Sequence, residues 1–207
     1  MKNIVVAGIG TGIGKTFIAA IITEALQADY WKPVQAGSLD FTDTDTVRSL
    51  VSNSISYFHP EAYRLSVAAS PHTAAEREGL TIELNLLHLP DSENRLIVEP
   101  AGGLMVPLNK TEVNIDLLKQ WKAPVILVSQ NYLGSINHTL LSIAALKQHA
   151  IELAGIIFNG ESNPSGENFI LDYTGAKCIG HINSEIAVNK TVVKQWADRL
   201  KPILNNL

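Results

Sequence analysis

The sequence predicts an α/β protein in which a mostly parallel sheet lies between helices on both faces, giving three layers. Two observations support this. Short, almost continuously apolar runs rich in Val, Ile and Leu alternate with longer segments of helical spacing, a pattern typical of strands buried on both faces. Glycine and polar residues follow these runs, as expected at the carboxyl ends of parallel strands, where such sheets bind ligands.

Five apolar runs are predicted as strands. Their ranges are 3–7, 95–99, 124–129, 154–158 and, more weakly, 176–180. Segments with helical spacing are predicted at 17–26, 136–149 and 189–200. The region 38–96 is less regular, and we expect at most two short helices there. The whole chain, 1–207, is expected to form one domain, because its length suits a single substantial core.

The composition narrows the class of function. Of the 207 residues, 46% are hydrophobic and 17% are charged, and the net charge is -4. A binder that neutralises nucleic-acid phosphates is usually basic, so we expect no nucleic-acid partner. The single cysteine, Cys178, cannot form an internal disulfide, which favours a reducing, cytoplasmic compartment. No apolar run approaches the roughly 20 residues of a membrane helix, and the first one breaks at Gly8, so we expect neither a membrane span nor a signal peptide.

The strongest functional signal is a glycine-rich loop between the first predicted strand and the first predicted helix. It reads GIGTGIGKT from Gly8 to Thr16. Glycines let several backbone N–H groups point at phosphate oxygens, and the following helix adds the partial positive charge of its N-terminus. In such loops Lys15 would reach the β- and γ-phosphates, and the Thr16 hydroxyl would bind Mg²⁺. The sequence therefore predicts a nucleotide site.

The spacing of this loop departs from the common G-x4-G-K-[ST] pattern, which needs glycine where the chain has Ile9. Counted from Gly8, the chain reads G-x5-G-K-T. A glycine-rich turn with an incidental lysine and a dinucleotide-binding fingerprint are the alternatives. Lys15 and Thr16, in a strand–loop–helix context, favour a nucleoside triphosphate over both.

Acidic residues near the strand ends are candidate magnesium ligands, because phosphate-bound Mg²⁺ takes a hydroxyl and one or two carboxylates. Glu99 ends an apolar strand and opens a Pro-Ala-Gly-Gly loop, so we favour it as a ligand over a carboxylate that only caps a backbone amide. Asp43 and Asp45 are further candidates in the run TDTDT. Asp and Thr are also common helix N-caps, and spacing alone does not decide between the two roles.

A second lysine, Lys32, ends a short strand-like run and precedes Pro33, which keeps it out of a helical backbone. Such a lysine could project into the cleft at the strand ends and neutralise charge on a transferred phosphoryl group. A solvent-facing lysine is the alternative, and the upstream phosphate loop raises the odds of the functional role.

Five motifs occur together in one order between Gly8 and His138. They are G-x5-G-K-T, W-K-P-V-Q-x-G, S-P-H-x-A-A, V-E-x-A-G-G and L-G-x-I-N-H. One motif alone would indicate only a phosphate-loop ATPase, but the set resembles the dethiobiotin synthetase family. The strand that ends at Asn159 fits as well, whereas the C-terminal segment matches only loosely.

The resemblance implies the phosphate-loop NTPase type of fold, with ATP and Mg²⁺ as cofactors. It also implies ring closure on 7,8-diaminononanoate. One amine captures CO₂ as a carbamate, ATP phosphorylates the carbamate, and the second amine attacks the mixed anhydride to close a cyclic urea. This is phosphoryl transfer to a weak carboxylate nucleophile, which depends on positioning and charge neutralisation.

Carried over position by position, the resemblance implies where each ligand binds. ATP would contact Gly12, Ile13, Gly14, Lys15, Thr16, Phe17, Asp45, Glu99, Pro100, Ala101, Gly102, Asn159, Gly160, Asn183, Ser184 and Glu185. Mg²⁺ would be held by Thr16, Asp45 and Glu99, while Lys15 and Lys32 would act in catalysis. The substrate would contact Lys32, Ala36, Gly134 and Asn137, in a pocket that the family completes across a homodimer interface.

Several positions depart from the family pattern. Ala36 replaces a hydroxyl residue that touches the carbamate, so the backbone or Ser38 would have to compensate. Gly10 and Gly12 stand where the loop usually has acidic residues. Pro100 replaces a glycine and removes an N–H donor near the nucleotide. Tyr173 is out of register with the family's substrate-binding tyrosine. These departures bear on substrate affinity more than on reaction type.

Two other functions share this kind of loop. A partitioning-type ATPase switch resembles the chain in its sheet, but such proteins carry an extra lysine five residues before the loop lysine, where this chain has Gly10. A small-molecule kinase should carry a mobile lid rich in arginine, and this chain shows no arginine cluster. Both alternatives predict ATP turnover that does not need CO₂.

Overall fold

The computed structural model describes residues 3–185 and 187–207 of the chain. Its main sheet has seven strands in the order β4-β2-β6-β1-β7-β8-β9, and every ladder between them is parallel. In chain order the strands are β1 (Asn3–Gly8), β2 (Asp29–Trp31), β4 (Phe58–His59), β6 (Leu96–Val98), β7 (Val125–Gln130), β8 (Leu153–Asn159) and β9 (Cys178–Ile182). A parallel sheet with helical crossovers confirms the predicted fold class.

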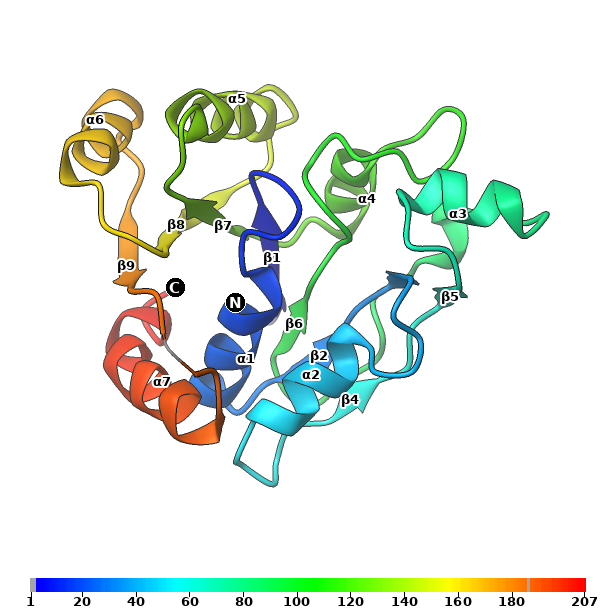
Figure 1. The fold of residues 1–207 in the computed structure, drawn as a ribbon, viewed down its shortest axis with the longest axis horizontal. Coiled ribbons are helices and arrows are strands. Elements are labelled where there is room, and N and C mark those ends of the chain that lie inside the picture. The colour runs from blue at the N-terminus through cyan, green and yellow to red at the C-terminus, as the bar shows by residue number, and fades with distance from the viewer. Residues whose placement is uncertain (1–2, 186) are drawn as a thin grey trace.

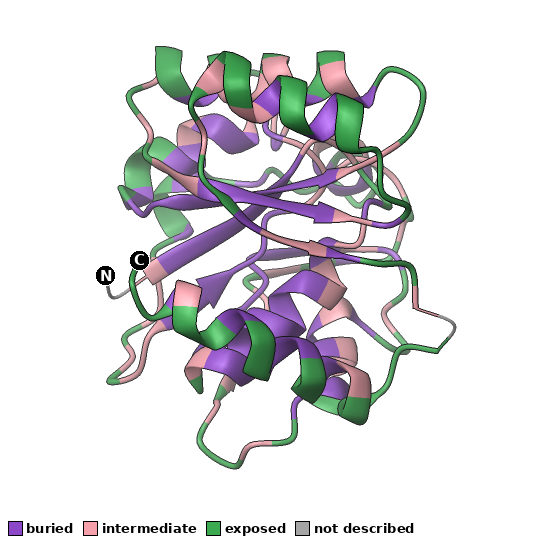
Figure 2. Cartoon of the chain, turned by 90° about the vertical axis from the view of Figure 1, so that its left-hand side faces the viewer, coloured by how far each residue is buried: buried purple, intermediate pink, exposed green. Residues whose placement is uncertain are grey.

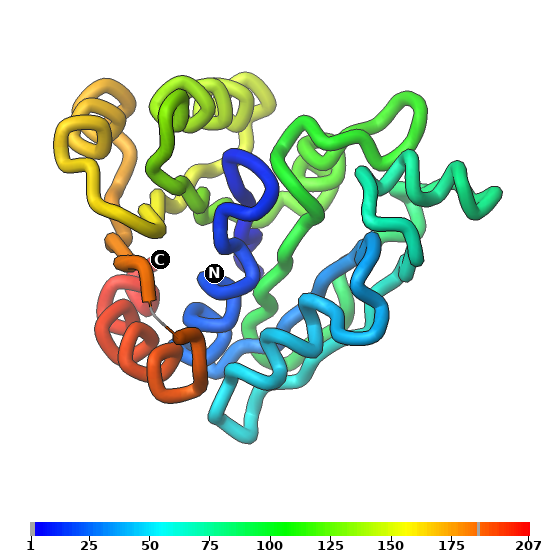
Figure 3. Tube along the Cα trace, in the orientation of Figure 1, coloured from blue at the N-terminus to red at the C-terminus, as the bar shows by residue number. Residues whose placement is uncertain are grey.

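The first strand lies at the centre of this sheet. In β1, Val5 pairs with Val98 of β6 on one side and with Val125 of β7 on the other. In the trace of Figure 3, the blue N-terminal segment accordingly runs through the middle of the fold. A second, two-stranded parallel sheet joins β3 (Val34–Ala36) to β5 (Tyr63–Leu65). The loop that follows β1 is therefore flanked by the ends of both neighbouring strands.

Helices cover both faces of the sheet (Figures 1 and 2). On one face pack α1 (Lys15–Leu26), α2 (Asp43–Leu50) and α7 (Lys190–Leu204). On the other lie α3 (Pro71–Arg77), α4 (Asn114–Trp121), α5 (Ser135–Gln148) and α6 (Pro164–Thr174), with a short 3₁₀ turn, η1 (Leu84–Leu86). The burial colours of Figure 2 show a buried sheet between helices whose outer sides are exposed.

The side chains of β1 point alternately to the two faces of the sheet, which explains why helices must cover both faces. Ile4 and Val6 join the apolar cluster under α1 and α7, whereas Val5 and Ala7 join the cluster under α3 and α4. All four side chains are nearly inaccessible to solvent. Because successive strand residues point to opposite faces, an unbroken apolar run is stable only when both faces are covered.

The elements match the sequence predictions at the centre of the sheet and differ at its edge. The two short helices expected within 38–96 are α2 and α3. The last strand begins at Cys178 rather than at residue 176, because Gly175 ends α6 in a left-handed conformation (φ 66°) and the next two residues form the connection. The sequence analysis did not predict α4 or α6. Among the described residues, no helix is both long enough and apolar enough to cross a membrane.

Candidate functional site

The glycine-rich loop connects β1 to α1 at the carboxyl edge of the sheet (Figure 1). Gly12 and Gly14 have φ values of 74° and 88°, in the left-handed region that glycine adopts without strain. A Cβ on Gly14 would lie 2.2 Å from the amide nitrogen of Asn159, so only glycine fits there. The Asn159 amide donates to the carbonyl of Ile13 at 2.9 Å. The loop is thus held from the end of β8.

Lys15 opens α1 with its side chain folded back into the loop. It is 6% exposed, and its ammonium donates to the carbonyl of Gly10 at 2.7 Å. Burial lowers the pKa of Lys15 to about 8, with Lys32 adding to the effect and Glu99 and Asp43 opposing it. The ammonium remains mostly charged at neutral pH, as a phosphate-binding lysine must.

Glu99, the residue directly after β6, is the centre of the polar network. It is 1% exposed. One carboxylate oxygen accepts a hydrogen bond from the Thr16 hydroxyl at 2.9 Å and lies 3.4 Å from the ammonium of Lys32. The other accepts from the Tyr30 hydroxyl at 2.8 Å. A buried carboxylate with three donors is held in one orientation.

Lys32, just after β2, is a buried cation rather than a solvent-facing one. It is 4% exposed, and its ammonium lies between the carboxylates of Glu99, at 3.4 Å, and Asp43, at 2.5 Å. Burial by itself lowers the pKa of Lys32, but the charges of Glu99 and Asp43 outweigh it and raise that pKa. A permanent positive charge therefore stands at the strand ends.

The structure places Asp43 in this network, whereas Asp45, the expected magnesium ligand, contacts other groups. Thr42 caps α2, and the Asp45 carboxylate reaches back to the backbone N–H of Thr42 at 3.0 Å. Asp45 also pairs with Arg48 at 2.6 Å. A capping box thus fully engages Asp45, while Asp43, two residues earlier, points to Lys32.

Three adjoining cavities surround this network. The first, of about 370 Å³, is lined by Thr11, Gly12, Gly14, Lys15, Thr16, Lys32, Asp43, Glu99 and Gly102. The second, of about 430 Å³, shares Thr11, Lys32, Asp43 and Gly102 with it. The third, of about 390 Å³, shares Thr11 and Val106 with the second and reaches α5 at His138. The three cavities are thus neighbours along the carboxyl edge of the sheet, and we call them together the cleft.

The second cavity holds several of the expected substrate and loop residues. Ala36 and Ala101 line it, together with Gln35, Ser70 and Pro71. Ser38, expected to compensate for Ala36, is exposed with a left-handed backbone (φ 54°) and does not line it. Ser70 and Thr11 are the hydroxyl residues that line it. Pro100 is buried behind the loop, and Phe17 packs partly buried against the core below α1.

Other expected nucleotide and substrate residues line none of these three cavities. Asn159 ends β8 and Gly160 follows it. The backbone N–H of Gly160 donates to the carbonyl of Ile182 at 2.9 Å, and Asn183, Ser184 and Glu185 come directly after Ile182. The carboxylate of Glu185 accepts a hydrogen bond from Trp196 at 2.6 Å. Gly134, the N-cap of α5, and Asn137 in its first turn are exposed, one turn from His138. Tyr173 is exposed on α6 and stacks on Phe169.

The side chains at the first cavity suit a magnesium ion that is also bound by phosphates. They offer the Thr16 hydroxyl and the carboxylates of Asp43 and Glu99, which are hard oxygen donors. Within residues 3–185 and 187–207, no cluster of three or more His, Cys, Asp or Glu side chains could hold a metal alone. This is the donor set expected for Mg²⁺, which is usually held by one or two carboxylates plus substrate phosphates.

Tyr30 and Asp43 are the site residues that the sequence analysis missed or left undecided. Tyr30 is fully buried on β2, and burial together with the Glu99 charge raises its pKa well above the usual value. It therefore stays protonated and donates to Glu99. A tyrosine in a strand is an ordinary β-former, so no sequence signal singled it out.

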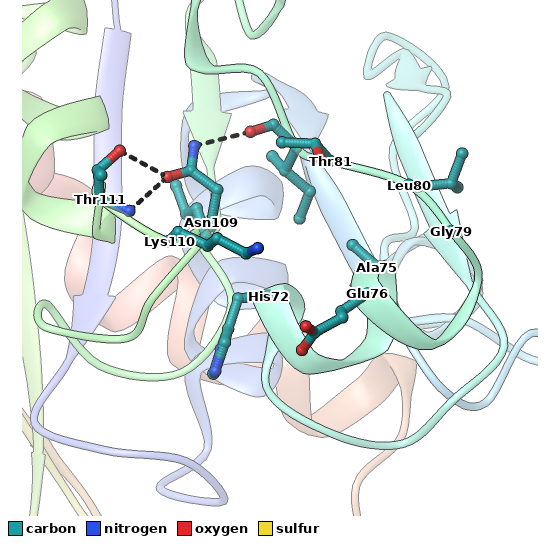
Figure 4. Close-up of a pocket in the computed structure, with 11 residues that line it drawn as sticks. His72, Ala75, Glu76, Gly79, Leu80, Thr81, Asn109, Lys110 and Thr111 are labelled. Carbon is teal, nitrogen blue, oxygen red and sulfur yellow. Dashed lines mark hydrogen bonds between the residues drawn. The ribbon is translucent and has the colours of Figure 1, made fainter.

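A fourth cavity lies behind α3, away from the phosphate loop (Figure 4). Its volume is about 440 Å³, its floor includes Ala75, Ile82 and Leu108, and Glu76 and Lys110 stand at its rim. It shares no lining residue with the cavities beside Lys15. We therefore leave it outside the candidate site.

Comparison with known proteins points to one chemistry. The family model described as "AAA domain" matches residues 2–192. The ATP-dependent dethiobiotin synthetase BioD of Cytophaga hutchinsonii is 51% identical over 201 residues, which cover 97% of each chain. The protein of the same name from Christiangramia forsetii is 47% identical over 200 residues, covering 97% of this chain and 96% of its own.

Solved structures share the fold at low sequence identity. A ParA family ATPase from Chlorobium tepidum is 13% identical with a TM-score of 0.60, over 95% of this chain and 97% of its own. The MinC:MinD cell division complex of Aquifex aeolicus gives 14% identity and a TM-score of 0.60, over 100% and 97%. At such identities the likeness concerns the arrangement of sheet and helices alone.

Proposed function

The chain belongs to the ATP-dependent dethiobiotin synthetases, ligases that form a C–N bond, and we propose that it closes the ring through a carbamate and a carbamoyl-phosphate-type mixed anhydride. One amine of 7,8-diaminononanoate adds to CO₂ and releases a proton, giving the carbamate. A carbamate oxygen takes the γ-phosphoryl group of ATP, and ADP leaves. The second amine attacks the carbamate carbon, inorganic phosphate and a proton leave, and the product is a cyclic urea.

One observation carries this proposal: the buried ammonium of Lys32 lies where the phosphate-loop cavity meets the second cavity. The carbamate is anionic, and it must approach a γ-phosphoryl group that is itself anionic. A fixed positive charge at the junction of the two cavities lowers that repulsion and stabilises the charge that develops during transfer. Because Asp43 and Glu99 raise its pKa, Lys32 is not a base at neutral pH. Its proposed role is electrostatic.

Lys15 and the glycine loop are proposed to hold the triphosphate. The backbone N–H groups of residues 12–16 and the N-terminus of α1 would bind phosphate oxygens, and the Lys15 ammonium would move from the Gly10 carbonyl to the β- and γ-phosphates. Asn159, Gly160 and the turn at 183–185 would face the adenine. The hydrogen bond from Asn159 to Ile13 supports this, because it joins the proposed base pocket to the phosphate loop.

Magnesium would be held by Thr16, Asp43 and Glu99, together with phosphate oxygens. When bound, it neutralises charge on the β- and γ-phosphates and helps to align the phosphoryl group. In this assignment Asp43 replaces Asp45, which is engaged in capping α2. The Thr16 hydroxyl already lies against Glu99, so the donors converge before any ligand arrives.

The diamine would lie in the second and third cavities with its carboxylate toward α5. Val34 and Val106 give the second cavity an apolar wall suited to a methylene chain. At the far end, the backbone N–H groups at the N-terminus of α5 and the Asn137 amide would bind the carboxylate. Gly134, at φ 99°, sets the start of that helix.

We further propose a homodimer that completes the substrate site, in a cytoplasmic enzyme. Gly134 and Asn137 are exposed, and a substrate carboxylate bound there needs cover from solvent. Large apolar side chains beside them are also exposed: Leu133 fully, Leu141 by 60% and Met105 by 61%. Such a patch beside a proposed ligand site is typical of a protein interface.

The decisive experiment measures the product by mass spectrometry after incubation with ATP, Mg²⁺, bicarbonate and the diamine. We expect dethiobiotin and one phosphate for each ring, with ¹³C from labelled bicarbonate in the urea carbonyl. Phosphate release should require both the diamine and bicarbonate, because the acceptor is made from them. Equal ATP turnover without the diamine would contradict the proposal and favour an ATPase switch.

A further inference from the structure

A buried carboxylate joins the carboxyl ends of three neighbouring strands beside the cleft. Glu167, in the first turn of α6, is 9% exposed. Its Oε1 accepts hydrogen bonds from the Asn131 amide at 2.6 Å and from the Asn163 backbone at 2.8 Å. Its Oε2 lies 3.0 Å from Nδ1 of His181. Asn131 directly follows β7 and His181 belongs to β9, so Glu167 connects the two sides of β8.

His181 carries this contact to the turn that follows β8. Its Nε2 lies 3.0 Å from the carbonyl oxygen of Gly160, which can only accept a hydrogen bond. Its Nδ1 faces Glu167. Burial raises the pKa of that carboxyl, but hydrogen bonds from Asn163, His181 and Asn131 outweigh it and lower the pKa, so Glu167 is ionised and accepts too. The two ring nitrogens therefore contact oxygen atoms of two different elements, α6 and the turn after β8.

We propose that His181 is a positioning residue for nucleotide binding, and that its ring, held by Glu167, fixes the Asn159–Gly160 turn against the phosphate loop. This inference rests on the proposed function, in which that turn faces the adenine. The link to the loop is direct: Asn159 donates to the carbonyl of Ile13, so a displaced turn also displaces the loop. His181 itself touches neither nucleotide nor substrate.

The test is the affinity for ADP, measured by calorimetry at a single pH. His181→Gln should bind ADP about threefold to tenfold more weakly than the wild type, the range of one hydrogen bond. The KM for the diamine should change little, because His181 is proposed to position the nucleotide site alone.

Two further variants separate positioning from general damage. Glu167→Gln keeps the size of the side chain but removes the charge that contacts the His181 ring, so it should also weaken ADP binding. The matched control is His88→Gln, because His88 is exposed in the loop before β6. It should keep the wild-type affinity.

A measurement on the unaltered protein avoids any folding defect in the variants. The ¹⁵N NMR signals of the His181 ring should move when ADP is added, because the turn that the ring contacts lies beside the proposed adenine site. Ring signals that ADP leaves unchanged would overturn the inference, as would ADP affinity in His181→Gln equal to wild type. Failure of the wild type to bind ADP would instead overturn the proposed function, and this inference with it.

Discussion

The hydroxyl of Tyr30 donates a 2.8 Å hydrogen bond to the Glu99 carboxylate at a point that solvent does not reach. That bond occupies the oxygen of Glu99 that faces away from Thr16 and Lys32. It leaves the other oxygen directed at the phosphate loop. A residue of the core thus sets the orientation of a proposed magnesium ligand.

Tyr30→Phe should therefore weaken magnesium binding without creating a cavity in the core. Phenylalanine keeps the ring but leaves one buried carboxylate oxygen without a donor, so we expect a loss of about 2 kcal/mol in the free energy of unfolding. The Mg²⁺ concentration for half-maximal activity should rise severalfold, while the KM for the diamine changes little. A magnesium titration and denaturant unfolding check both. Tyr57→Phe is the control, because Tyr57 is 59% exposed; the same effect in both variants would contradict the role given to Tyr30.

Lys32→Met should abolish ring closure while nucleotide still binds. Methionine keeps much of the length of the side chain but removes the charge at the junction of the two cavities. We expect kcat to fall at least about a hundredfold, the usual cost of losing one electrostatic contact in the transition state. ADP affinity, measured by calorimetry, should change far less. Normal turnover would remove Lys32 from the mechanism. Loss of ADP binding would mean that Lys32 contributes to nucleotide binding rather than to stabilising the transition state.

Gly14→Ala should destabilise the protein far more than Gly12→Ala, although both glycines have positive φ. At Gly12 an added Cβ meets nothing within 4 Å, so the cost is backbone strain alone, about 1 kcal/mol. At Gly14 the same strain is joined by a Cβ 2.2 Å from the Asn159 amide, which must then give up its bond to Ile13. Unfolding free energies of the two variants without ligand test the difference. Equal losses would show that Asn159 does not constrain the loop.

Glu24 should make stability depend on acid pH. Burial raises the pKa of this carboxyl, but hydrogen bonds from Ser52 and Asn53 outweigh it, and the pKa lies below the usual value. A carboxyl with a lowered folded-state pKa contributes stability above its unfolded value of about 4.5, and this contribution is lost as pH falls through the folded value. Glu24→Gln should be less stable than wild type at neutral pH, and the gap should narrow toward pH 3. A constant gap in denaturant unfolding would contradict this account.

The sequence predicted the centre of the fold and the phosphate loop because both rest on local pattern. β1 and β7 contain uninterrupted apolar runs at 4–7 and 125–128, and the glycines between Gly8 and Thr16 indicate a curled loop. The edge elements depend on tertiary contacts. α4 and α6 are short, and their faces become recognisable only against the sheet. The capping residue Asn163, whose side chain accepts from the Gly166 N–H, was the available signal for α6.

The same limit explains the assignment of the acidic ligands. In the run TDTDT, both Asp43 and Asp45 follow a threonine that could cap a helix, so the run itself allows the helix to begin after either threonine. Residues distant in the sequence decide which aspartate joins the polar network. The Gln35 amide oxygen accepts a hydrogen bond from the backbone N–H of Asp43 at 3.3 Å, and Lys32 pairs with its carboxylate. Neither contact can be deduced from the run itself.

Asp43→Asn and Asp45→Asn give the clearest comparison in the site, since the two residues share a helix turn and differ only in what they contact. Asp43→Asn removes a proposed magnesium ligand and one of the two anions that raise the pKa of Lys32, so kcat should fall at least about tenfold and the Mg²⁺ requirement should rise. Asp45→Asn weakens the N-terminal cap of α2 and the pair with Arg48, which should cost about 1 kcal/mol of stability and leave kcat within about twofold. Steady-state kinetics at varied Mg²⁺, beside thermal unfolding of the same samples, separates the two effects. If Asp45→Asn were the variant that lost activity, the register that the structure gives to α2 would be wrong, and Asp45 would return as the metal ligand.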